Sequence, residues 1–210
     1  MLSIVMLTLG LVETNTYLVA DEASGQAVVI DPAWDGKRIL AEAERRGWHV
    51  VSLWLTHAHF DHLGGAAGLA DALNPPPPVA LHPDDQALWH MEGGAPAFGM
   101  HIDPGPEPTI DLSDGQILYL GETQVEVRHT PGHTRGGVIF YCPSENLAFV
   151  GDLIFQGSVG RTDLPGGDFD TLLTSIQNQV LSLPDETVLL PGHGPRTTVG
   201  AERLTNPFLT

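Results

Sequence analysis

Four side chains that can bind a metal ion lie within seven residues, 56–62, directly after an apolar run. The run, residues 50–55, is rich in Val, Leu and Trp and is followed by small and polar residues, which predicts a buried strand that leads into a loop. Imidazole nitrogens and carboxylate oxygens suit zinc, iron or manganese, and neighbouring ligands at the end of a rigid strand are easily preorganised. The segment therefore predicts a metal site at a strand end rather than a chance run of surface histidines.

Three further candidate ligands also follow segments that are typical of strands. They are His133 after residues 123–129, Asp152 after residues 147–150 and His193 after residues 187–190. Each is preceded by glycine, which lets the backbone turn tightly and approach a ligand. Because loops at strand ends gather where open sheets bind their ligands, these residues are expected to meet the first motif.

The joint pattern is more informative than any single residue in it. The candidate ligands are His57, His59, Asp61, His62, His133, Asp152 and His193. Any one of them alone would more often be an ordinary core or loop residue. Together they are too many for one four-coordinate ion and suit two ions that share a bridging carboxylate.

Composition narrows the class of protein and of partner. The 210 residues, 42% of them hydrophobic, are expected to form one domain over residues 1–210. A net charge of -17, with Lys37 as the only lysine, disfavours a nucleic-acid partner because the chain repels phosphates.

The apolar residues 1–12 lack a basic segment and are too short to span a bilayer, so we expect a first strand and a soluble, cytoplasmic protein without a membrane partner. The single cysteine, Cys142, excludes an intramolecular disulfide and is expected to be a buried structural thiol.

Strand-like and helix-like segments alternate along the chain, without an internal repeat or a clear linker. Strands are predicted at residues 3–9, 16–20, 27–30, 50–55, 79–81, 117–120, 123–129, 138–141, 147–150 and 187–190. Helices are predicted at residues 37–46, 63–73, 83–91 and 199–204, and from a cap at Asp168 or Asp170 through Val180. Residues 93–108, dense in Gly and Pro, predict a long loop that either covers part of a site or packs irregularly.

The ligand pattern is similar to that of the metallo-β-lactamase fold superfamily, whose signature is His-x-His-x-Asp-His followed by a downstream His, an Asp and a final His. The resemblance reaches from residues 15–19 and 29–32 to residues 202–209. More narrowly, Gly-Ser-Val-Gly-Arg-Thr-Asp-Leu-Pro-Gly-Gly-Asp at residues 157–168 resembles a loop of the short, single-domain relatives of glyoxalase II (hydroxyacylglutathione hydrolase). The fold implied is an α/β protein of the αββα sandwich type, with two mixed β-sheets face to face, helices on the outer faces and metals at one edge.

The resemblance also implies how the ligands divide between two divalent ions. His57, His59 and His133 would hold the first ion, Asp61, His62 and His193 the second, and Asp152 would bridge the two. Zinc is the expected ion, with iron or manganese as alternatives. Asp31, Thr56 and Asp163 are candidates to contact the histidines and fix their protonation states, with an ordinary capping or turn role as the alternative for each.

The chemistry implied is hydrolysis of a small-molecule thioester. A metal-bound hydroxide would attack the carbonyl, with Asp61 and Asp152 as the catalytic carboxylates. The expected substrates are glutathione-type or related acyl thioesters, with another ester or a lactone as an alternative. Candidate substrate-binding residues are Phe98, Arg161 and Arg196. The chain lacks the basic C-terminal extension with which two-domain glyoxalase II grips glutathione, so the thiol, like the oligomeric state, stays open.

Other branches of the superfamily fit less well. The flavin-linked di-iron branch has Glu at the position of His59, lactam-hydrolysing members generally lack the Asp that Asp152 supplies and are exported, and the RNA-processing branch carries basic elements. The main alternative is a persulfide dioxygenase with one iron on His57, His133 and Asp152. The loop continuation Leu-Pro-Gly-Gly-Asp and the additional ligands in the first motif favour hydrolysis. A non-catalytic metal-binding protein is a third, disfavoured, hypothesis.

Overall fold

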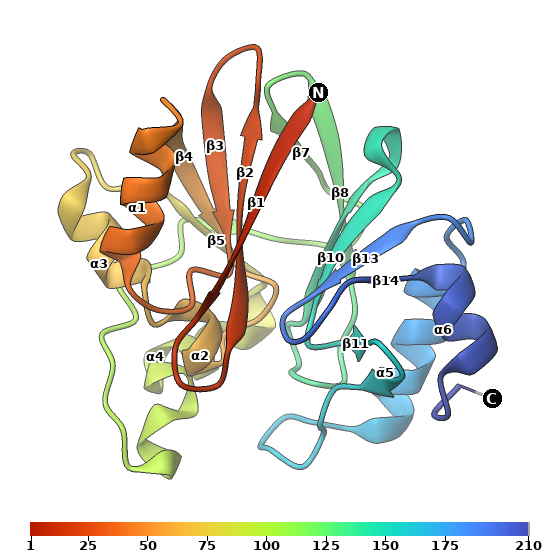
Figure 1. Ribbon diagram of the computed structural model, residues 1–210. Helices are drawn as coiled ribbons and strands as arrows, with labels where there is room; N and C mark the ends of the chain where they lie inside the picture. The colour runs from red at the N-terminus through yellow and green to blue at the C-terminus, as the bar shows by residue number, and fades with distance from the viewer. Residues whose placement is uncertain (210) are drawn as a thin grey trace.

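Two six-stranded mixed sheets lie face to face in the computed structural model, which describes residues 1–209 (Figure 1). The first sheet has the order β1 (Leu2–Leu9), β2 (Thr14–Asp21), β3 (Gln26–Ile30), β4 (His49–Trp54), β5 (Val79–Leu81) and β6 (Ile110–Asp111). Its first three strands are antiparallel, and the strands from β3 to β6 are parallel. Parallel strands need crossover connections, and α1 (Gly36–Arg45) joins β3 to β4 in this way.

The second sheet is antiparallel except at one pair of strands. Its order is β14 (Thr197–Thr198), β13 (Val188–Pro191), β10 (Leu147–Gly151), β9 (Val138–Cys142), β8 (Thr123–His129) and β7 (Ile117–Leu120). Only β10 and β13 run parallel. A small hairpin of β11 (Ile154–Phe155) and β12 (Ser158–Val159) follows β10.

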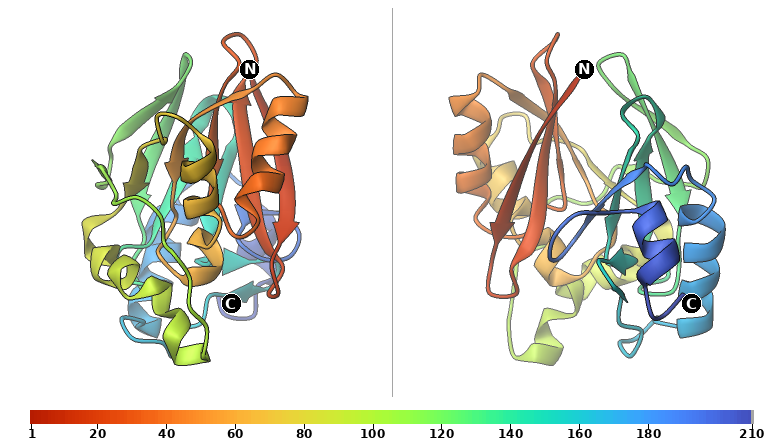
Figure 2. Two further views of the ribbon diagram at one scale, coloured as in Figure 1. Left: turned by 90° about the vertical axis from the view of Figure 1, so that its left-hand side faces the viewer. Right: turned by 45° about the vertical axis from the view of Figure 1, so that its right-hand side comes forward.

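Helices cover both outer faces, and short helical segments lie near the lower edge in Figure 1. The outer helices are α1 and α3 (Ala66–Ala72) on the first sheet, with α5 (Phe169–Ser175) and α6 (Val199–Thr205) on the second (Figure 2). The short segments are α2 (Phe60–Leu63), η1 (Pro83–Asp85), α4 (Gln86–His90) and η2 (Glu92–Phe98), with η3 (Pro143–Glu145) elsewhere and η4 (Ile176–Val180) continuing α5. This arrangement confirms the predicted αββα sandwich.

Strand alternation explains why the core has three apolar layers. Consecutive side chains of β2 point to opposite faces, so Tyr17 packs between the sheets with Phe140, whereas Leu18 packs outward with Ile39 of α1. A third layer, which includes Leu172 of α5, covers the outer face of the second sheet. Burying each such side chain contributes roughly 1.5–3 kcal/mol to stability.

All ten predicted strands occur, each within two residues of its expected ends, and the expectation that Cys142 is a buried thiol is confirmed. The sequence did not reveal β6, β11, β12 and β14, because each has only two residues and therefore no periodicity. Asp168, not Asp170, caps α5, since its Oδ1 accepts a hydrogen bond of 2.8 Å from the Thr171 N–H.

Two predicted helices differ from the structure. The single helix expected at residues 63–73 is two helices, α2 and α3, separated by Gly64 and Gly65. These glycines lie against the backbone of Pro32 and Ala33, where a Cβ would be within 3.0 Å of a carbonyl oxygen, so the chain bends here. The helix expected at residues 83–91 begins as the 3₁₀ turn η1. Within residues 1–209, none of the helices combines the length and the apolar character that crossing a bilayer requires.

Candidate metal centre

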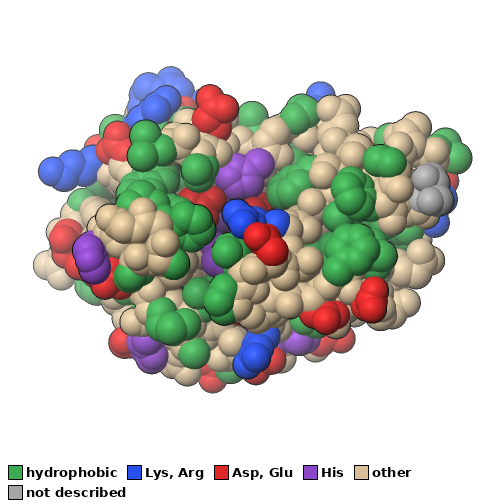
Figure 3. Space-filling view, turned by 90° about the horizontal axis from the view of Figure 1, so that it is seen from below, with side chains coloured by type: hydrophobic (Ala, Val, Ile, Leu, Met, Phe, Trp, Pro, Cys, Tyr) green, Lys and Arg blue, Asp and Glu red, His purple; other side chains and the backbone are tan. Residues whose placement is uncertain are grey.

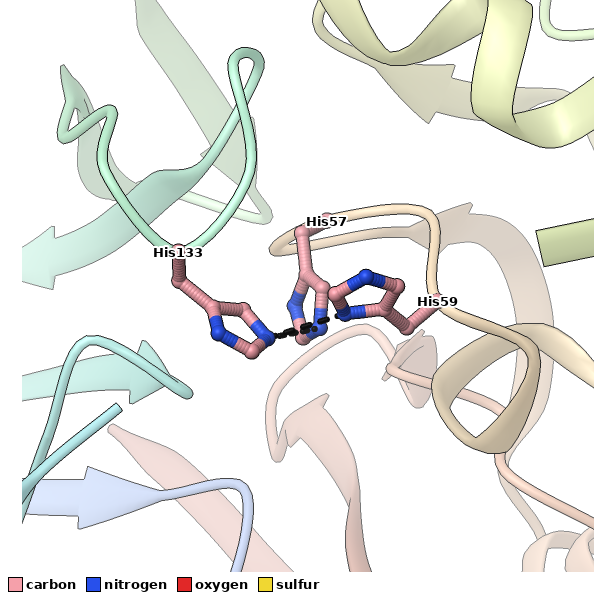
Figure 4. A group of neighbouring side chains, drawn as sticks. All are labelled: His57, His59 and His133. Carbon is pink, nitrogen blue, oxygen red and sulfur yellow. Dashed lines mark hydrogen bonds between the residues drawn. The ribbon is translucent and has the colours of Figure 1, made fainter. Parts of the chain in front are cut away.

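His57, His59 and His133 form the first group of candidate ligands, and they come from the loops after β4 and β8. The Nε2 atom of His133 lies 3.2 Å from Nε2 of His57 and 2.9 Å from Nδ1 of His59. All three side chains are buried, and their rings meet edge to face around a common point (Figure 4). A tetrahedral zinc ion places its nitrogen ligands about 3.3 Å apart, so the spacing suits one ion.

The hydrogen bonds behind these rings determine where their protons lie. Thr56 donates its hydroxyl proton to Oδ2 of Asp31 (2.6 Å), so its oxygen accepts from Nδ1 of His57 (3.0 Å). The carbonyl oxygen of Arg161 accepts from Nδ1 of His133 (2.7 Å). The Nε2 atoms of His57 and His133 then carry no proton in the neutral rings, and two lone pairs face each other at 3.2 Å. A cation between them removes this repulsion, so the donor set fits a divalent ion.

Asp61, His62 and His193 form the second group, from α2 and the loop after β13. Oδ2 of Asp61 lies 3.2 Å from Nε2 of His193 and 3.5 Å from Nε2 of His62. The other nitrogen of each ring forms a hydrogen bond on the side away from Asp61. Nδ1 of His62 donates to Asp31 (2.9 Å), and Nδ1 of His193 donates to the carbonyl oxygen of Val12 (3.1 Å). Both Nε2 atoms therefore face the Asp61 carboxylate.

Asp152 lies between the two groups. Its Oδ2 is 3.7 Å from Nε2 of His133 in the first group and 3.5 Å from Nε2 of His193 in the second, and its Oδ1 is 3.3 Å from Nε2 of His62. Among residues 1–209, Oδ1 of Asp152 and Nε2 of His62 are buried atoms that have no hydrogen-bond partner of acceptable geometry. Such atoms cost about 1–3 kcal/mol each, and a shared ion would satisfy both. Asp152 therefore adjoins candidate ligands of both groups.

The glycines before the downstream ligands allow this close packing, as the sequence indicated. A Cβ on Gly192 would collide with Asp152 and with His62. Gly132 has φ 132°, and a Cβ there would collide with the backbone of Leu172. The loops that carry His133 and His193 can therefore approach the centre only with glycine at these positions.

Two of the three residues expected to support the histidines do so. Asp31 binds His62, and Thr56 binds His57. The expectation for Asp163 is wrong: its carboxylate forms two hydrogen bonds of 2.7 Å with the Arg161 guanidinium, and the Arg161 carbonyl supports His133 instead. Contact with a buried histidine ring would require the Asp163 carboxylate to lose its water. An exposed Asp next to an exposed Arg is stabilised more by their ion pair than by such a contact.

Asp85 is a supporting residue that sequence reasoning missed. This buried carboxylate accepts hydrogen bonds from the Ala58 N–H (3.1 Å), the Thr134 hydroxyl (2.8 Å) and the Gly136 N–H (2.7 Å). It thereby joins the loop of His57 and His59 to the loop of His133. Its position soon after the predicted strand at residues 79–81 is the signal that could have identified it.

The three predicted substrate-binding residues occupy different places. Phe98 lines a cavity beside His59 and packs on Phe60, with ring centroids 5.4 Å apart. Arg161 is exposed and paired with Asp163, and Arg196 is exposed on the loop that follows His193. On the face seen from below, histidine, acidic and basic side chains gather at the centre, with hydrophobic side chains to either side (Figure 3).

The two groups of ligands differ in protonation before an ion binds. Burial, together with the neighbouring histidines, holds the pKa of His57 well below its usual value, and burial and His133 lower the pKa of His59 to about 3. Burial opposes the charged form of His62 and His193 as well, but Asp152 and Asp61 outweigh it. These carboxylates raise the pKa of His62 well above its usual value and the pKa of His193 to about 9.

Binding of a metal ion to the second group of ligands is therefore expected to release protons. At pH 7 an ion that binds Asp61, His62 and His193 must displace the protons on both rings, so up to two protons are released, and the proton from His193 is no longer released once the pH rises above about 9. His57 and His59 are already neutral and contribute none. Calorimetric zinc titrations of chelator-treated protein, in buffers of different ionisation enthalpy at pH 7 and 9.5, measure this release. Equal proton release at both pH values would contradict the prediction.

Comparisons with known proteins agree with this geometry. Residues 9–193 match the family described as the metallo-beta-lactamase superfamily. The chain is 37% identical over 204 residues to the probable metallo-hydrolase YqgX of Bacillus subtilis, covering 95% of this chain and 94% of that protein. It is 35% identical over 198 residues to the hydroxyacylglutathione hydrolase GloC of Haemophilus influenzae, covering 94% and 93%.

Solved structures give the same result. A structure described as the BLEG-1 B3 metallo-beta-lactamase has a TM-score of 0.91 and 37% identity, with all of both chains covered. TTHA1623 in a di-iron-bound form has a TM-score of 0.88 and 44% identity, covering 98% of this chain and 100% of that one. ETHE1 from Myxococcus xanthus has a TM-score of 0.82 and 25% identity, covering 98% and 83%. With its clusters of His and Asp ligands for divalent metal, the chain belongs to the metallo-β-lactamase superfamily of metallo-hydrolases.

Proposed function

We propose that the protein is a binuclear metallo-hydrolase that cleaves glutathione-type or related acyl thioesters. The observation that carries the proposal is that His62 and His193, which also face Asp61, lie against Asp152, and that Asp152 adjoins the first group of histidines as well. A dioxygenase with a single iron would give those three residues no role. The GloC relative, named a hydroxyacylglutathione hydrolase, supports the substrate class.

In this proposal each group of three residues holds one ion, and Asp152 bridges them. Zinc is the proposed ion, with iron or manganese as alternatives, and the di-iron form of TTHA1623 supports two ions in such a site. When bound, two divalent ions lower the pKa of a shared water and polarise a carbonyl oxygen. Asp61 is held by the Thr14 hydroxyl, which donates to its Oδ2 at 3.1 Å, so this carboxylate can orient the attacking water. The cytoplasmic location, and a small-molecule partner rather than nucleic acid or membrane, stay predictions from the sequence.

The expected result is hydrolysis of S-lactoylglutathione under air-free conditions by protein that contains two metal ions per chain. Loss of the thioester absorbance measures the reaction, and elemental analysis of freshly purified protein measures the metal. One iron per chain, with oxygen uptake on glutathione persulfide, would instead support the dioxygenase.

Lactam hydrolysis is a second candidate because of one comparison. The sequence disfavours it, since Asp152 supplies a carboxylate that lactam-hydrolysing members generally lack. The structure named as a B3 metallo-beta-lactamase nevertheless matches this chain over its whole length at 37% identity. Turnover of a chromogenic cephalosporin, compared with turnover of S-lactoylglutathione by the same preparation, ranks the two activities.

A further inference from the structure

A cavity of about 380 Å³ lies beside His59. Its apolar walls are formed by Leu88, Met91, Pro96, Phe98, Leu164 and Pro165. This volume is within the range of roughly 300–1,000 Å³ that is usual for small-molecule sites. Since His59 itself forms part of the wall, a group in this cavity would lie next to the first group of ligands.

The cavity has no partner for a charged substituent. Neither Lys nor Arg is among its lining residues, and the one carboxylate there, that of Glu92, is already bound. Glu92 accepts hydrogen bonds from the Ile102 N–H (3.0 Å) and from Nδ1 of His101 (3.1 Å). A glycine or glutamate carboxylate of glutathione would therefore lose water here without compensation, whereas an apolar chain would gain from burial.

The wall of the cavity is held in a fixed position relative to His59. Gly93 has φ 61°, and a Cβ there would collide with the backbone of Phe60 and approach the Ala58 carbonyl oxygen to 2.8 Å. The segment that follows carries Phe98, whose ring packs on Phe60. Because Ala58 and Phe60 flank His59 in the chain, the cavity and the metal ligand are built on the same short segment.

Charged groups are found instead outside the cavity lining, on the loop that follows His193 and on the loop whose residues Leu164 and Pro165 form part of the cavity wall. Arg196 follows His193 of the second group, and Arg161 with its partner Asp163 belongs to the loop that supports His133. The charged groups of a polar thiol such as glutathione would find partners of opposite charge there. The uncharged cavity is then available to the part of the substrate on the other side of the scissile bond.

We propose that this cavity binds the acyl group of the substrate, and that the enzyme therefore prefers thioesters of apolar acyl chains longer than acetyl or lactoyl. The inference rests on the proposed thioester hydrolysis and adds the acyl class to it. Hydrolysis breaks the C–S bond: water supplies the hydroxyl group of the carboxylic acid, whose apolar chain lies in the cavity, and the proton of the thiol, which leaves toward the charged residues.

Two series of thioesters test the assignment in the metal-loaded enzyme. In one series the thiol is glutathione and the acyl chain lengthens from acetyl to hexanoyl, and in the other the acyl group is acetyl and the thiol carries alkyl chains of increasing length. Burial of each methylene is expected to raise kcat/KM about fourfold in the first series, or roughly 200-fold over the four added methylenes, with little change in the second. A flat acyl series, or a preference that follows the thiol chain, would overturn the proposal.

Three variants test whether the preference for longer apolar acyl chains depends on the cavity. Phe98→Ala is expected to lower the ratio of kcat/KM for the hexanoyl thioester to kcat/KM for the acetyl thioester roughly tenfold. Phe208→Ala is the matched control, since Phe208 is 46% exposed, close to the 49% of Phe98, and does not line the cavity. Ala97→Trp should fill the cavity from its exposed rim and flatten the acyl series without reducing metal content.

A binding measurement separates failure of this inference from failure of the proposed function. Neutral N-alkylacetamides, titrated calorimetrically into metal-free protein, should bind about fourfold more tightly per added methylene, and Ala97→Trp should abolish this trend. If no thioester is cleaved but the trend is found, the thioester hydrolysis is wrong and the apolar site remains. If thioesters are cleaved but the amides show no trend, the acyl site is wrong and the hydrolase remains.

Discussion

Asp152→Ala is expected to lose both metal ions and at least about 1,000-fold in kcat/KM for thioester hydrolysis. The Asp152 carboxylate adjoins both groups of ligands, lying 3.7 Å from His133 and 3.3 Å from His62. Its removal takes a ligand and a negative charge from both ions, and a loss of about 4 kcal/mol in transition-state stabilisation corresponds to the stated factor. Elemental analysis of the variant, together with steady-state kinetics, measures the two losses.

The matched control is Asp163→Ala in the neighbouring loop. Asp163 is an exposed carboxylate whose partner is Arg161, so its removal should leave both ions in place. Treatment with a chelator should abolish the activity of the wild-type protein and of this control, and added zinc should restore it in both but not in Asp152→Ala. Two ions and near-normal turnover in Asp152→Ala would show that the bridging assignment is wrong.

Asp31→Ala is expected to lower the free energy of unfolding by about 3–5 kcal/mol and to lose the ion held by His62. The buried Asp31 carboxylate accepts hydrogen bonds from the Thr56 N–H (2.7 Å), the Thr56 hydroxyl (2.6 Å) and Nδ1 of His62 (2.9 Å). Alanine leaves these donors unpaired in the interior and must also adopt the positive φ of 51° found here. Thermal unfolding should show a fall in Tm of roughly 6–20 °C.

Asp31→Asn separates the structural role from the metal-binding role. Asparagine tolerates the positive φ and its oxygen can still accept from the Thr56 N–H, so the cost should be smaller than for alanine. Its NH₂ group, however, would face Nδ1 of His62, which must then accept a hydrogen bond and carry its proton on Nε2, the atom that would bind the ion. We expect a folded protein with one ion fewer per chain. An unchanged metal content in Asp31→Asn would refute this account of the His62 tautomer.

The fold could be predicted to a large extent because its signals are local. Each predicted strand is an apolar run of four or more residues or is bounded by Gly, Pro, Asn or Asp, and burial of alternate side chains on both faces of β2 leaves little freedom in its register. Features that depend on contacts with distant parts of the chain could not be predicted from the sequence. The break between α2 and α3 depends on the approach of Pro32 to Gly65, which is not visible in either segment alone.

The supporting residues of the centre show the same limit. Asp31 and Thr56 could be anticipated because they adjoin predicted strand ends, but Asp163 was expected to contact a histidine and pairs with Arg161 instead. Asp85 was not anticipated at all, since its three donors come from two loops that are distant in the chain. Such contacts depend on how loops meet, and the hydrogen-bonding capacity of an acidic residue does not specify its partner.

The motif at residues 56–62 by itself determined the kind of site, because four ligands directly after a buried strand have few other uses. The site also needs ligands from other parts of the chain. The glycine that precedes each of His133, Asp152 and His193 indicated these residues as candidates. Only the tertiary structure decided that Asp152 adjoins both groups of ligands, that four of the histidines are held through Nδ1 by partners outside the centre, and that an apolar cavity with neither Lys nor Arg among its described lining residues lies beside His59. The physical reason is that ligand chemistry is a property of single residues, whereas a bridge, a tautomer and a cavity are properties of distances between residues far apart in the chain.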